Sequence, residues 1–114
     1  MNIEEFRAYC LQKKGSHEDF PFGDDTLVMK VLGKIFALAN LDGPMRINLK
    51  CDPEKAIDLR EHFPSVRQAY HMDKKHWNTI DVDGSVPDSL IREWIDHSYE
   101  LVVAKLPLKL KREL

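Results

Sequence analysis

Short β-rich segments separated by tight turns, between residues 27 and 50, are the feature that most constrains how this chain folds. Residues 27–32 and 35–41 flank Gly33-Lys34, which predicts a tight reversal, and Asp42-Gly43-Pro44 marks a second turn. In residues 45–50 the apolar side chains of Met45, Ile47 and Leu49 alternate with those of Arg46, Asn48 and Lys50. Because this period of two puts one side of a strand on the core and the other in water, the segments predict an antiparallel meander with one solvated face.

Helical patterns lie on both sides of this meander. Asn2 and Glu5 form a capping pattern ahead of an apolar stripe that ends near Gly15, and Asp52-Pro53 opens a second helix that Pro64 ends. Pro87 opens a third helix, expected over residues 87–106, with a continuous apolar stripe. Residues 16–26 lack any period and are expected to form a loop.

Two further β-rich segments, residues 66–71 and 77–82, are separated by a short polar stretch and predict a hairpin. The resulting order, α-βββ-α-ββ-α, predicts an α+β domain with helices packed on one face of a largely antiparallel sheet. With 114 residues we expect one domain spanning residues 1–114.

Composition excludes several classes of protein. The chain is 43% hydrophobic and 32% charged, which is unlike a disordered or fibrous sequence. No apolar run approaches the ~18 residues of a membrane span, and the first residues lack the pattern of a secretion signal. Cys10 and Cys51 are too few for a disulfide framework and indicate reduced thiols. We therefore expect a cytoplasmic monomer with no membrane contact.

Charge is distributed unevenly along the chain, whose net charge is −2. Residues 27–80 carry nine basic and six acidic side chains, whereas residues 81–104 carry one basic and six acidic ones. Strong non-specific DNA binding depends on neutralising phosphates, so the net acidity argues against it. A local basic surface still forms if folding brings the cations of the middle segment together.

Motifs for catalysis are weak in this sequence. Asp96, His97 and Ser98 are consecutive on a helix, where neighbouring side chains point about 100° apart and cannot form a relay. Cys51 precedes a helix cap, where a thiol pKa can fall, but no histidine is placed beside it. His71 and His76, with Asp73, offer too few ligands at familiar spacing for zinc, so a pair of surface histidines is favoured. Phosphate-binding glycine motifs are absent, and we expect neither an enzyme nor a cofactor.

Cationic and polar side chains lie at the two hairpin turns and on one strand face. The first turn carries Lys30 and Lys34, and the strand face carries Arg46, Asn48 and Lys50. The second turn carries Lys74, Lys75 and His76, followed by Trp77 and Asn78 at the start of a strand. Lysine and arginine bind phosphate, asparagine reads base edges, and an exposed aromatic ring stacks on bases. An ordinary solvated sheet with charged turns has the same pattern, and a tryptophan at a strand start is more often buried.

Four blocks of residues carry a resemblance to a known family: 21–22 with 28–37, 49–64, 70–79 and 96–102. The most specific are His-Met-Asp-Lys-Lys-His-Trp-Asn-Thr at 71–79 and His-Ser-Tyr-Glu-Leu-Val at 97–102. Over nearly the whole chain they resemble the MmcQ/YjbR family of small bacterial proteins. The resemblance implies a frataxin-like (CyaY-like) topology and a double-wing arrangement, with the wings at Gly33-Lys34 and Asp73-Lys74-Lys75. It also implies DNA binding.

Three hypotheses follow from the sequence. The first is a DNA-binding or regulatory protein that contacts phosphates through its basic hairpin wings. The second is an adaptor that presents the same face to an acidic protein. The third is a small-molecule or metal-binding domain centred on residues 71–77.

Overall fold

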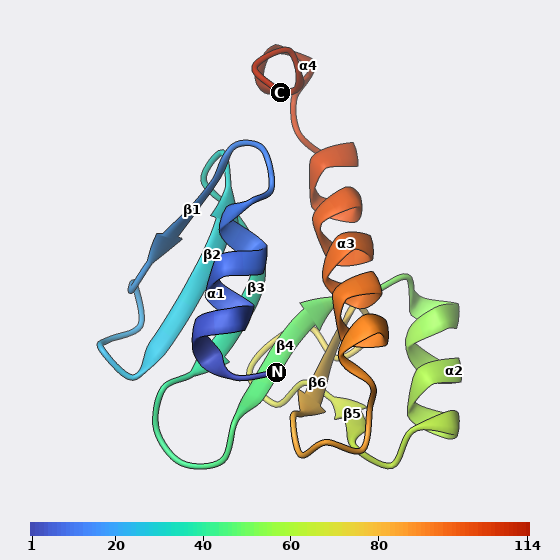
Figure 1. The fold of residues 1–114 in the computed structure, drawn as a ribbon. Helices are drawn as coiled ribbons and strands as arrows, with labels where there is room; N and C mark the ends of the chain where they lie inside the picture. The colour runs from blue at the N-terminus through green and yellow to red at the C-terminus, as the bar shows by residue number, and fades with distance from the viewer.

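The computed structural model describes residues 1–114 as one α+β domain. Its helices and strands follow in the order α1 (Ile3–Leu11), β1 (Ser16–Asp19), β2 (Thr26–Val31), β3 (Lys34–Asn40), β4 (Arg46–Lys50), α2 (Pro53–His62), β5 (Val66–Gln68), β6 (Trp77–Asp81), α3 (Asp88–Ala104) and α4 (Leu108–Lys111). All six strands form one sheet in the order β1-β2-β3-β4-β6-β5, and every neighbouring pair is antiparallel. The three longer helices cover one face of this sheet (Figure 1). The meander, the second hairpin and the one-sided helix layer predicted from the sequence are confirmed.

Strand β1 corrects the prediction that residues 16–26 form a loop. It adds to the free edge of β2, with Ser16 opposite Val31 and Asp19 opposite Val28. Its residues, Ser-His-Glu-Asp, have no apolar alternation because an edge strand of charged residues gains its stability from pairing rather than from burial. An ion pair between Arg7 of α1 and Glu18, at 2.5 Å, also holds it in place.

The turn between β2 and β3 is a two-residue reversal, as expected, but it is centred one residue earlier than the sequence indicates. Leu32 and Gly33 both have positive φ, 46° and 86°, and Lys34 already pairs with Val31. Positive φ at both central positions is the geometry of the hairpin turn that follows the twist of the strands. Lys34 is therefore the first residue of β3 and lies exposed beside the turn.

The main core lies between the sheet and helices α1 and α3. Phe6 and Cys10 of α1 and the apolar stripe of α3 bury against the inner side chains of the sheet, and Trp94 of α3 is 5% exposed. The stripe predicted for residues 87–106 is thus confirmed, although the helix itself runs from Asp88 to Ala104. Pro107 starts the short helix α4, which the sequence did not predict and after which Leu114 lies against Gly15.

A β-bulge in β3 explains why a serine occupies the apolar stripe of α3. Between Met29 and Lys30 the register of β2 and β3 shifts, which leaves Phe36 outside the ladder. The Ser98 hydroxyl donates to the Phe36 carbonyl (2.6 Å) and accepts from the Lys50 N–H (2.9 Å). One side chain therefore satisfies a backbone donor and a backbone acceptor where the β3–β4 pairing ends.

The residues on either side of Ser98 fix α3 to other parts of the fold. The His97 ring nitrogen Nε2 accepts a hydrogen bond from the Asp52 N–H at the start of α2 (3.2 Å). The Tyr99 hydroxyl donates to the Lys14 carbonyl, and its ring packs edge-on against Phe36. The conspicuous 96–102 block of the sequence therefore positions α3, and the side chains of Asp96, His97 and Ser98 each bond to a different part of the fold instead of to one another.

The loop between β5 and β6, residues 69–76, crosses the opposite face of the sheet. Asp73 organises it, because its carboxylate accepts from the Lys75 N–H (3.0 Å) and contacts the His76 ring (2.7 Å). Met72 packs with Ile35 against a small second core of Val28, Leu38, Ala69 and Trp77. None of the helices combines the length and apolar character that crossing a bilayer requires.

Candidate nucleic-acid interface

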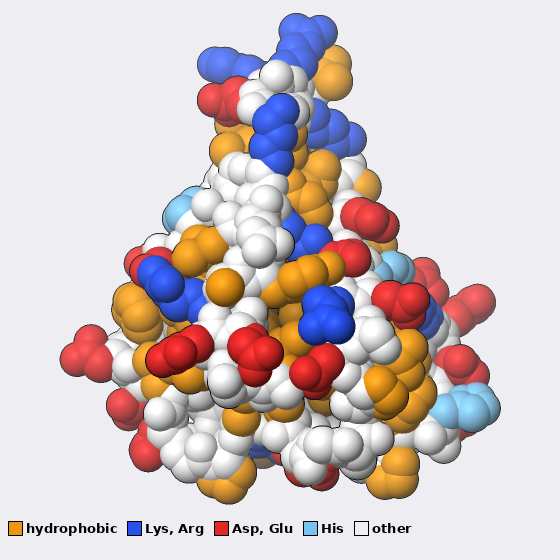
Figure 2. Space-filling model, viewed as in Figure 1, with side chains coloured by type: hydrophobic (Ala, Val, Ile, Leu, Met, Phe, Trp, Pro, Cys, Tyr) orange, Lys and Arg blue, Asp and Glu red, His pale blue; other side chains and the backbone are white.

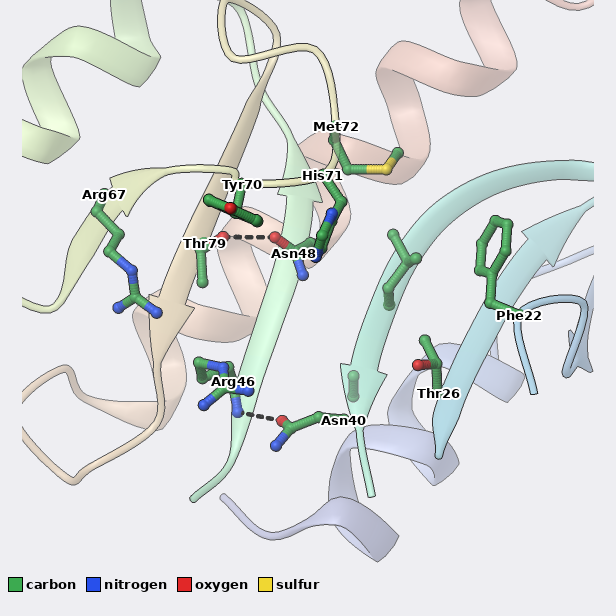
Figure 3. Close-up of a pocket in the computed structure, with 12 residues that line it drawn as sticks. Phe22, Thr26, Asn40, Arg46, Asn48, Arg67, Tyr70, His71, Met72 and Thr79 are labelled. Carbon is green, nitrogen blue, oxygen red and sulfur yellow. Dashed lines mark hydrogen bonds between the residues drawn. The ribbon is translucent and has the colours of Figure 1, made fainter. Parts of the chain in front are cut away.

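The face of the sheet opposite the helices carries an open groove of about 630 Å³. Its floor comes from β2, β3, β4 and β6, and its sides come from the 20–25 loop, β5 and the 69–76 loop (Figure 3). The lining residues are Phe22, Thr26, Leu38, Ala39, Asn40, Arg46, Asn48, Arg67, Tyr70, His71, Met72 and Thr79. Two are arginines, of which Arg67 forms an ion pair with Asp81 beside the groove and Arg46 forms none, so the excess positive charge favours an anionic ligand.

Hydrogen bonds among these residues set the polar floor of the groove. The Asn40 amide donates to the carbonyls of Asp42 and Pro44, and its oxygen accepts from the Arg46 N–H (2.6 Å). The Thr79 hydroxyl donates to the Asn48 amide oxygen (2.5 Å), which leaves the Asn48 Nδ2 group as a free donor. Figure 3 shows these side chains on adjacent strands.

Two exposed aromatic rings stand on opposite sides of the groove. Phe22, in the loop between β1 and β2, is 63% exposed, and Tyr70, after β5, is 81% exposed. The Tyr70 ring packs edge-on against His71, with 4.6 Å between ring centroids. Both rings offer flat apolar surfaces to a ligand, and the contact with His71 restrains that of Tyr70.

The two predicted wings lie at the same end of this sheet face. Val31 opposite Lys34, and Lys50 opposite Trp77, place the β2–β3 turn and the 69–76 loop beyond the same ends of the strands. Ile35 and Met72, which adjoin these two turns, pack into the same small core. We call the set Lys34, Lys50, Lys74 and Lys75 the cationic end.

None of these four lysines takes part in an ion pair, and Lys34, Lys74 and Lys75 are exposed. Lys50 is half-buried, and burial, followed by the nearby charge of Lys105, lowers its pKa. On the helix side, Lys and Arg also gather at the tip of the molecule, over α4 and the end of α3 (Figure 2). This end of the sheet therefore attracts anions.

The other predicted cations are placed differently. Lys30 forms an ion pair with Asp19 (2.7 Å), and His76 bonds to Asp73 (2.7 Å), so neither is free. Arg46 is exposed at the opposite end of β4, in the groove, and has no ion-pair partner. The predicted cations are thus divided between the cationic end and the groove, and do not form a single patch.

Trp77 and Asn78 are buried, so the prediction that they face a nucleic acid is wrong. Trp77 is 8% exposed because its ring fills the small core beneath the 69–76 loop. Asn78 is 2% exposed, and its side chain bonds to the Ala56 carbonyl and to Arg60 of α2. Asn78 joins α2 to the sheet and cannot read bases.

Sequence reasoning missed several residues that line the groove, chiefly Arg67, Tyr70 and Phe22. Arg67 lies opposite Thr79 in the β5–β6 ladder, so pairing the two strands of the predicted hairpin is enough to place Arg67 beside Thr79. The exposure of Tyr70 had no such signal, because β5 ends at Gln68, short of the strand expected over residues 66–71. The groove joins residues from five strands and two loops, and a linear pattern does not show this.

Both thiols are buried, which agrees with the interpretation that neither cysteine is a reactive nucleophile. Burial raises the pKa of Cys51 to about 11 and that of Cys10 to about 12. A thiol with so high a pKa is almost wholly protonated near neutral pH and is a poor nucleophile. No group of three or more His, Cys, Asp or Glu side chains is arranged to hold a metal ion.

The family model named YjbR matches residues 11–101. An uncharacterised YjbR protein of Escherichia coli K12 is 36% identical over 115 residues, covering 100% of this chain and 97% of its own length. An uncharacterised YbdF protein of Escherichia coli O157:H7 is 41% identical over 85 residues, covering 74% of this chain and 70% of its own length.

Solved structures show the same fold. The crystal structure of the Deinococcus radiodurans protein DR2400, which has a DUF419 domain, superposes with a TM-score of 0.91 at 39% identity. The match covers 98% of this chain and 86% of that one. A Pseudomonas syringae protein gives a TM-score of 0.78 at 29% identity, covering 89% of this chain and 98% of its own. From the family match, the full-length relative and the shared fold together, we conclude that this chain belongs to the YjbR family.

Proposed function

We propose that this protein binds DNA through the uncovered face of its sheet, without catalysing a reaction. Phosphates are held by the cationic end, with Lys34 on one turn and Lys74 and Lys75 on the other. The observation that supports the proposal is that both turns project from one end of the same face and carry lysines without carboxylate partners. Such a pair of projections suits the backbone of a nucleic acid. A frataxin-like topology, a double-wing mode of binding, a monomeric state and a cytoplasmic location belong to the same proposal.

The net charge of −2 sets the expected character of this binding. The acidic side chains concentrate in residues 81–104, mostly on α3, which belongs to the helix layer and faces away from the groove. Only a few phosphates are contacted, so the affinity is modest and falls with salt in proportion to that small number of contacts. An acidic protein is the competing partner for the same lysines.

The test is the fluorescence anisotropy of a labelled DNA of ~20 nucleotides at low salt, with charge-reversed variants. Lys34→Glu and Lys74→Glu each reverse one exposed charge, and Arg92→Glu makes the same change of charge on the helix layer. We expect each lysine variant to weaken binding by about tenfold and the Arg92 control to change it by less than about twofold. The proposal is wrong if the wild-type protein does not bind DNA at low salt, or if all three variants bind equally.

A further inference from the structure

The groove lies next to the cationic end on the same sheet face, and its residues differ in kind from those of that end. The cationic end consists of lysines, which bind phosphate as point charges. The groove instead combines two guanidinium groups, two exposed aromatic rings and an amide donor. This mixture suits a ligand that presents a flat ring and a phosphate together.

The two arginines are arranged to take a phosphate. The Asn40 side chain accepts from the Arg46 N–H and fixes the start of β4, while the Arg46 guanidinium has no ion-pair partner. Arg67 bonds to Asp81 through Nη1, which orients its planar group and leaves its other N–H donors free. Arginine binds phosphate oxygens in a two-pronged geometry that lysine cannot reproduce.

The aromatic rings and Asn48 are arranged to take bases. Tyr70 and Phe22 flank the floor of the groove, and the Asn48 Nδ2 donor lies between them on β4 (Figure 3). A base stacks on such rings only when it has left the stack of a duplex, because both of its faces are covered there. The distance between the cationic end and Arg46 also suits a short stretch of single-stranded DNA, since the five residues of β4 from Lys50 to Arg46 span roughly 13 Å.

We infer that the groove binds unpaired nucleotides, so that the preferred ligand is a single strand running from the cationic end towards Arg46. The inference rests on the proposed function, because the lysines hold the same backbone. Bases lie against Tyr70 and Phe22, Asn48 donates to a base edge, and Arg46 and Arg67 hold the next phosphate. Charge complementarity supports this occupant, because Arg46 has no ion-pair partner and Asp81, which pairs with Arg67, leaves the two arginines with an excess of positive charge.

The experiment compares single-stranded and duplex DNA of one sequence, by anisotropy, for variants of the groove and for matched controls. Tyr70→Ala and Arg46→Gln change the groove, whereas Ile57→Ala and Arg92→Gln remove an exposed apolar side chain and a guanidinium on the helix layer. Melting temperatures confirm that all variants fold.

We expect the wild-type protein to prefer the single strand, and each groove variant to lose about tenfold in affinity for it. Duplex affinity changes by less than about twofold in all four variants. Equal affinity for the two forms, or unchanged single-strand affinity in both groove variants, overturns the inference. The proposed function survives that result if Lys34→Glu and Lys74→Glu still weaken duplex binding. A free nucleoside monophosphate that competes as well as the strand does also overturns it, in favour of a small-molecule site.

Discussion

At the scale of single residues, the most specific sequence blocks of this chain maintain the fold. His97, Ser98 and Tyr99 each bond to a different backbone segment, and Asp73 shapes the loop that precedes β6. A cluster of unusual polar residues is thus explained by the backbone groups that it satisfies. These contacts join residues that lie far apart in the sequence, so composition and local spacing do not reveal them.

Ser98 provides the clearest test at this scale. In Ser98→Ala the Phe36 carbonyl and the Lys50 N–H lose their partner in a buried site. We expect the free energy of unfolding to fall by about 1–3 kcal/mol, because buried polar groups without partners carry their desolvation cost. Urea unfolding followed by circular dichroism measures the change. Ser89→Ala, on the exposed side of the same helix, should leave stability within about 0.5 kcal/mol, and an equal loss in both variants contradicts the role of Ser98.

His97 predicts a pH dependence of stability. Burial, and then the charge of Lys55, lowers its pKa below the ordinary value of 6.5. The unfolded chain therefore binds a proton near pH 6.5 that the folded chain resists, so stability falls as the pH drops through this range. His62, whose pKa is raised by Asp58, contributes with the opposite sign in every variant. His97→Gln should flatten the fall in unfolding free energy between about pH 7.5 and 5.5, whereas curves parallel to the wild type contradict the assignment.

At the scale of elements, the sequence predicts the helices and strands that have a strong apolar period. It misses those that form only by pairing with a neighbouring strand. The meander and the apolar stripe of α3 follow from alternation and 3-and-4 spacing, and both are confirmed. Strand β1 was missed because its four polar residues become a strand only beside the edge of β2. The short β5 has the same cause, since its ladder with β6 stops at Gln68 and the chain then turns to form the loop.

Helix α3 packs its apolar side chains into the core, whereas the 69–76 loop exposes its lysines. We therefore expect a sharp contrast in stability between a variant of the helix and a variant of the loop. Trp94 is 5% exposed and packs edge-on against Phe63, whereas Lys74 is exposed in the 69–76 loop. We expect Trp94→Ala to lose about 3–5 kcal/mol and Lys74→Ala less than about 0.5 kcal/mol. A loss of that size approaches the whole stability of a small domain. Thermal melts of the two proteins check this. Similar melting temperatures contradict the assignment of Trp94 to the core and of Lys74 to the surface.

At the scale of the whole molecule, the fold separates a helix-covered face from a face open to ligands. The sequence predicts the cations of the open face but not their grouping, which depends on the sheet register and on the local carboxylates. Asp19 neutralises Lys30, Asp73 holds His76, and the groove gathers Arg46 with Arg67. Five of the nine residues expected to contact nucleic acid are thus exposed or half-buried without an ion pair: Lys34, Arg46, Lys50, Lys74 and Lys75. The aromatic rim, which has no linear signature, completes the surface.

The dependence of the DNA-binding constant on salt concentration tests most directly whether the cationic end binds phosphates. For a single strand, each neutralised phosphate contributes about −0.7 to the slope of log K against log salt, so four lysines predict about −3. The double variant Lys34→Glu/Lys74→Glu should reduce the magnitude of the slope by about half or more. A wild-type slope near zero, or a slope unchanged in the double variant, contradicts the assignment of the cationic end as a binding site for phosphates.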